Sequence, residues 1–134
     1  MPAHFSAVSF LVRDYDEAIV WFTQKLGFRL IEDTSLSDMK RWVVVAPPGA
    51  GAGGAALLLA RAANEEQLAQ IGRAAGGRVA FFLHTDDFAR DRTLFEARGV
   101  RFREAPRRES YGIVAVFDDL YGNGWDLIEL QPRA

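Results

Sequence analysis

The sequence of 134 residues contains no cysteine. This absence excludes disulfide bonds, zinc sites with thiolate ligands and cysteine nucleophiles. Histidine is scarce too, since His4 and His84 are the only two. No apolar run approaches the roughly 18 residues of a membrane-spanning helix, and the N-terminal segment reaches a charged residue too early for a signal peptide. We therefore expect a soluble cytoplasmic protein that does not associate with membranes.

An excess of charge of one sign is also lacking. The 16 basic and 18 acidic residues give a net charge of −2. The chain therefore lacks the excess of positive charge that is typical of a nucleic-acid-binding protein. The arginine-rich stretch "RFREAPRRE" (101–109) is interpreted as solvated. Apolar residues make up 49% of the chain and include 10 phenylalanines. That content is enough for the core of one compact unit, or of two small modules that share a core.

The two halves of the chain repeat the same pattern of predicted strands and a helix. Residues 7–33 predict a strand, a helix and a strand: Asp14 or Asp16 suits the helix N-cap, and Gly27 suits the position after its end. The expected buried face of this helix carries Ala18, Ile19, Phe22 and Leu26. Residues 80–106 repeat the pattern, with a helix that ends at Gly99 and a short strand after it.

Two further strands are predicted after each helix. In the first half they are residues 40–47 and 55–61, separated by the Gly/Ala-rich loop "PGAGAGGA"; in the second half they are residues 111–119 and 125–130. The sequence thus predicts an α+β protein of two tandem βαβββ modules. We place module 1 at about 4–61, a linker helix at about 62–77 and module 2 at about 78–131.

The segments "VRDYDEAIVWFTQKLGF" and "VFDDLYGNGWDLIEL" resemble the vicinal oxygen chelate superfamily. This superfamily includes glyoxalase I, extradiol dioxygenases, fosfomycin-modifying enzymes and bleomycin-binding resistance proteins. The resemblance covers nearly the whole chain. It implies that the modules form a curved mixed sheet, a cup that receives the ligand, and that two chains pair as a homodimer.

The resemblance also identifies the four places where catalytic members hold a divalent metal. These places correspond here to Ala7, approximately Leu58, Ala80 and Asp126. Only Asp126 can bind a metal, whereas a protein site for such an ion usually supplies three or more ligands. We therefore expect no metal and no other cofactor, and we do not expect glyoxalase I activity.

Alternation along the strands predicts which side chains line the cup. His84 lies four residues beyond Ala80 and shares its face, and it is the one candidate whose ordinary pKa lies near neutrality. The expected ligand-binding residues are Ser9, Leu11, Arg41, Phe82, His84, Tyr111 and Asp126. Structural roles stay open for three of them: Arg41 as a solvated strand end, Tyr111 as a loop cap, and Asp126 as a carboxylate held by backbone amides or by Arg41.

Three functions are compatible with these residues. The first is metal-independent binding of a small, partly apolar molecule, neutral or anionic, as in resistance proteins that sequester a drug without turnover. The second is an isomerase or lyase, or a dioxygenase-like enzyme, that uses His84 as a catalytic acid or base. The third is a metalloenzyme with a rearranged site. The sequence argues most strongly against the third.

Overall fold

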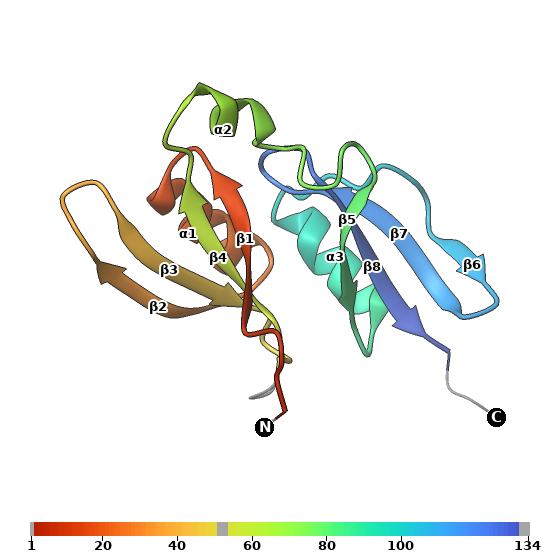
Figure 1. The fold of residues 1–134 in the computed structure, drawn as a ribbon. Helices are drawn as coiled ribbons and strands as arrows, with labels where there is room; N and C mark the ends of the chain where they lie inside the picture. Colours follow the sequence, from red (N-terminus) through yellow and green to blue (C-terminus); the bar gives the residue numbers. More distant parts are fainter. Residues whose placement is uncertain (1, 51–53, 132–134) are drawn as a thin grey trace. The chain divides into compact units, whose positions relative to one another are not determined.

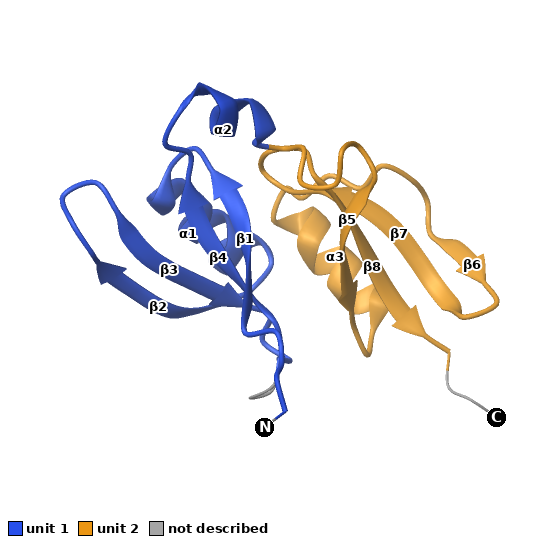
Figure 2. Ribbon diagram, in the orientation of Figure 1, with its two compact units in different colours: residues 1–71 blue, residues 72–134 orange. Residues whose placement is uncertain are grey.

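The computed structural model describes residues 2–50 and 54–131, so part of the Gly/Ala-rich loop lies outside the described residues. The chain divides into two compact units, residues 1–71 and 72–134 (Figure 2). Each unit contains a four-stranded sheet, and three helices accompany the two sheets in the part of the chain that is described (Figure 1). The predicted α+β class is confirmed, and so is the order of one strand, one helix and three strands in each unit. No helix among the described residues is long and apolar enough to cross a membrane.

Unit 1 forms a mixed sheet in the order β1-β4-β3-β2. Its strands are β1 (Ala7–Val12), β2 (Arg29–Ser35), β3 (Arg41–Ala46) and β4 (Ala56–Arg61). β1 and β4 are parallel, whereas the other neighbours are antiparallel. Helix α1 (Tyr15–Lys25) covers one face, because Phe22 packs edge-on against Phe10 of β1 with their ring centroids 5.3 Å apart.

Local signals in the sequence set both ends of α1. The carboxylate of Asp14 accepts a hydrogen bond from the Glu17 backbone N–H at 2.8 Å, which satisfies a free donor of the first turn. Gly27 follows the helix with φ of 71°, a conformation that favours glycine. Of the four residues predicted on the buried face, Ala18, Phe22 and Leu26 are at most 4% exposed, whereas Ile19 is only partly buried.

Unit 2 repeats this arrangement in the order β5-β8-β7-β6. Its strands are β5 (Val79–His84), β6 (Arg107–Glu109), β7 (Gly112–Asp118) and β8 (Gly124–Leu130). Helix α3 (Phe88–Ala97) covers one face, where the ring centroids of Phe95 and Phe117 are 5.6 Å apart. We call the face opposite α1 in unit 1, or opposite α3 in unit 2, the open face of that unit.

Two details differ from the sequence-based expectation. The predicted linker helix at 62–77 is reduced to α2 (Glu65–Gln70), and the boundary between the compact units falls just after it, at residues 71 and 72. The short strand expected directly after Gly99 is only an isolated bridge between Phe102 and Phe117. The fourth strand of unit 2 is β6 instead, which lies inside the arginine-rich stretch 101–109, so the interpretation of that stretch as only solvated is wrong.

Candidate functional site

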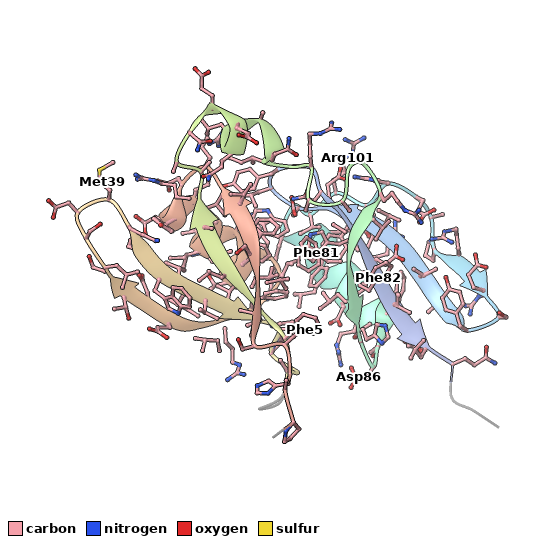
Figure 3. All side chains as sticks on the ribbon, in the orientation of Figure 1. Phe5, Met39, Phe81, Phe82, Asp86 and Arg101 are labelled. Carbon is pink, nitrogen blue, oxygen red and sulfur yellow. The ribbon has the colours of Figure 1, made fainter. Side chains whose placement is uncertain are left out.

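The open face of unit 2 carries a row of side chains centred on Asp126. Phe82 of β5 lies opposite Asp126 of β8, and Asp126 lies opposite Val116 of β7. Residues that are paired in this way point to the same face of a sheet. Their sequence neighbours Phe81, Phe117 and Trp125 point to the other face, where the Phe81 and Trp125 rings are 4.5 Å apart (Figure 3). The alternation along the sequence predicts that Phe82 and Asp126 share one face of the sheet, and the structure places them on one face.

Asp126 is the polar centre of this face. Its Oδ1 atom is buried and has no hydrogen-bond partner. Burial raises the pKa of the carboxyl, the nearby charge of Arg107 lowers it, and the charge of Glu104 raises it. A buried carboxylate oxygen without a donor costs folding free energy and leaves an acceptor that a hydrogen-bond donor of a ligand can satisfy.

Glu104 and Arg107 form the polar edge of the row. Glu104 Oε2 accepts a hydrogen bond from the Val116 backbone N–H at 3.0 Å, so this side chain replaces a neighbouring strand where β6 has not yet begun. Glu104 Oε1 accepts from Arg107 Nε at 2.9 Å, and Arg107 Nη1 donates to Glu109 at 3.1 Å. These bonds hold Arg107 at the sheet edge, close enough to influence Asp126.

His84 occupies the next row of the same face. It lies opposite Ile128, two residues beyond Asp126 along β8. Diagonal neighbours of this kind have Cα atoms about 7–8 Å apart, which long side chains can bridge. His84 is exposed and Phe82 is 62% exposed, so an imidazole and an apolar ring are both accessible beside the buried carboxylate.

The other predicted site residues lie elsewhere. Ser9 and Leu11 occupy the open face of unit 1, opposite Leu58 and Ala60 of β4. Tyr111 lies in the turn between β6 and β7, five residues before Val116, which is about 16 Å along an extended strand. The structure therefore brings together Phe82, His84 and Asp126 within unit 2, and it does not bring Tyr111 to them.

Arg41 lies on the helix-covered side of its sheet. It shares that side with Val43 and donates to Asp33 on β2 at 2.7 and 3.1 Å and to Asp16 on α1 at 3.0 Å. The pKa of Asp33 is lowered by its hydrogen bond to Arg41. Arg41 thus connects the sheet to its helix, and its carboxylate partners are Asp33 and Asp16 instead of Asp126.

Two residues at the polar edge of this row were not predicted from the sequence. Glu104 and Arg107 lie in the arginine-rich stretch, whose lack of apolar alternation gave no sign of a strand. Two glutamates among the four arginines of residues 101–109 were the available signal, because carboxylates interspersed in such a run indicate local charge pairing.

The residues at the family's metal places do not fit a metal. Ala7 and Leu58 lie on unit 1 strands and Ala80 lies on β5, and none of these side chains has a donor atom. Among the described residues, no three His, Asp or Glu side chains are grouped closely enough to hold an ion. Asp126 alone retains a donor at its place.

Comparisons with known proteins agree with this geometry. The model of the Glyoxalase/Bleomycin resistance protein/Dioxygenase superfamily matches residues 3–127. An uncharacterized protein of Shewanella frigidimarina is 52% identical over 94% of this chain and 93% of its own length. The crystal structure of UcmS2 has a TM-score of 0.80 at 27% identity, over 96% of this chain and 98% of its own. TnmS3, an antibiotic binding protein from Streptomyces sp. CB03234, has a TM-score of 0.75 at 26% identity, over 97% of this chain and 98% of its own.

Proposed function

Because the chain belongs to the Glyoxalase/Bleomycin resistance protein/Dioxygenase superfamily, we propose that it binds a small, partly apolar organic molecule without a metal and without turnover. The observation that carries this proposal is the buried, unpartnered oxygen of Asp126 beside the exposed ring of Phe82. One polar anchor within an apolar wall is the usual composition of a small-molecule site. Sequestration of an antibiotic-like compound is the finer form of the proposal, and the likeness to an antibiotic binding protein supports it.

The ligand should carry a hydrogen-bond donor, such as an ammonium, amide or hydroxyl group. Such a donor would satisfy Asp126 Oδ1, and a hydrogen bond to a charged group is worth about 1.5–3 kcal/mol. Phe82 would add about 1–2 kcal/mol, because a ligand can bury most of its exposed ring surface. His84 would donate or accept one further hydrogen bond from the adjacent row.

A thermal-shift screen of small antibiotics and aromatic metabolites tests the proposal, with calorimetry to measure the affinity of each hit. Asp126→Asn, Phe82→Ala and His84→Ala should each weaken binding by about tenfold. Asp38→Asn is the matched control, because Asp38 is exposed and lies in unit 1. The affinity of Asp38→Asn for each hit should equal that of the wild type.

Chromatography of the ligand after prolonged incubation with the protein separates sequestration from catalysis. We expect the ligand to be recovered unchanged and in full. A product that forms with the wild type and not with His84→Ala would overturn the proposal and favour acid–base catalysis by His84. Hits whose affinity is unaffected by all three substitutions would exclude this face as the site.

A further inference from the structure

The sheet of unit 1 separates into two ribbons at one end. β3 pairs with β4 only where Val43–Val45 lie opposite Leu57–Leu59. Beyond that, β3 continues beside β2 as far as Arg41, and β4 continues beside β1 as far as Arg61. The two strands therefore diverge at the ends that carry these arginines, as Figure 1 shows.

A cavity of about 510 Å³ lies in the gap between the diverging strands. This volume falls within the range of about 300–1,000 Å³ that is usual for small-molecule sites. Apolar side chains provide most of its wall: Trp42 from β3, Leu58, Leu59 and Ala60 from β4, and Tyr15 and Met39 from the neighbouring segments. Trp42 is 41% exposed, so its indole has apolar surface available for a ligand.

Arg41 borders the cavity, but its charge is already compensated. Its guanidinium is bonded to Asp33 and Asp16 and lies 5.1 Å from the centroid of the Tyr15 ring. Its backbone N–H donates to the Tyr15 hydroxyl at 3.2 Å. Arg41 therefore fixes the wall and has little free charge to offer a ligand.

Arg61 and Lys40 differ from Arg41 in this respect. Both line the same cavity. The Arg61 guanidinium lies 5.9 Å from the centroid of the Tyr15 ring, yet neither cation forms an ion pair with any residue that the structure describes. Two uncompensated positive charges at an apolar cavity constitute a complementary surface for an anion with an apolar body.

We infer that this cavity is a second binding site, specific for small aromatic carboxylates. The carboxylate pairs with Arg61, which the Tyr15 ring orients, and Lys40 adds a second positive charge. The aromatic body packs against Trp42 and Leu58. This site lies entirely in unit 1 and does not depend on the function proposed for the open face of unit 2.

Naphthalene-2-carboxylate is a suitable probe, and naphthalene-2-carboxamide is its neutral counterpart of the same shape. Calorimetry should show the carboxylate binding about tenfold more tightly than the carboxamide, because only the carboxylate forms charge-assisted bonds. Amide NMR shifts on binding should centre on Trp42, Ala60 and Gln67, which line the cavity. Equal affinity for the two probes, or no binding of the carboxylate at millimolar concentration, would overturn the inference.

Arg61→Gln should lower the affinity for the carboxylate about tenfold and leave that for the carboxamide unchanged. Arg61→Lys should restore most of the affinity, which separates loss of charge from loss of folding. Arg108→Gln is the control, because Arg108 is an exposed residue of β6, and Asp126→Asn should bind the probe like the wild type. Wild-type affinity in Arg61→Gln would refute the site even if the function proposed for unit 2 held.

Discussion

Asp126→Asn should make the protein more stable at neutral pH while it weakens ligand binding. The substitution preserves the shape of the side chain and removes its negative charge. In the folded wild type, Oδ1 is buried without a donor, and burial raises the pKa of the carboxyl. Burying a charged oxygen without a donor costs more than burying the neutral amide that replaces it, and the positive charge of Arg107 offsets part of this difference. We expect the free energy of unfolding at pH 7 to rise by about 0.5–1.5 kcal/mol in the variant.

The gain should depend on pH in a defined direction. Because the folded-state pKa of Asp126 lies above its ordinary value of 3.8, the wild type loses stability as pH rises from that value through the raised one. At lower pH the carboxyl is protonated in both the folded and unfolded states, so the two proteins should be similarly stable. The pKa values of Asp33 and Asp86 are lowered by Arg41 and Arg90, but these groups are present in both proteins and cancel in the difference.

Urea denaturation at several pH values between about 3 and 7 measures this difference. An NMR titration of the Asp126 carboxyl carbon gives an independent check, since one unit of pKa elevation corresponds to about 1.4 kcal/mol. Asp38→Asn, an exposed site, should change stability by less than about 0.5 kcal/mol at every pH. A variant that is less stable than the wild type at pH 7, or whose stability difference is independent of pH, would refute the reasoning.

Three further predictions concern the turn after β7, metal content and assembly. Asp119→Asn should lower the free energy of unfolding, measured by urea denaturation, by about 2–4 kcal/mol. Both carboxylate oxygens of Asp119 accept hydrogen bonds, from Asn123, Trp125 and the Tyr121 backbone, and the NH₂ group of an asparagine would face these donors. Unchanged stability would contradict this prediction. Elemental analysis should find no stoichiometric divalent metal, and chelation should leave the melting temperature unchanged; a metal that is lost in Asp126→Asn would contradict it. Light scattering should give about twice the 14.9 kDa of one chain, and a mass near that of a single chain would exclude the homodimer we predict.

The elements that local signals specify were predictable from the sequence. Asp14 and Gly27 delimit α1 because an N-cap carboxylate and a glycine with positive φ act within one turn of the helix. The alternation of β5 and β8 assigned Phe82, His84 and Asp126 to one face because side chains along a strand repeat every two residues. β6 was missed because Arg107–Glu109 has no apolar alternation, and it becomes a strand only through its pairing with β7.

The sequence by itself determined the duplicated module, its helices and the face on which Asp126 lies, since each follows from spacing along the chain. Only the tertiary structure decided which charges meet. Arg41 pairs with Asp33 and Asp16 because strand pairing and helix docking bring three distant segments together. Asp126 has a buried oxygen without a donor, under the influence of Glu104 and Arg107, because the segment before β6 lies along the edge of β7. The distances that decide desolvation and ion pairing depend on residues far apart in sequence, and no local pattern encodes them.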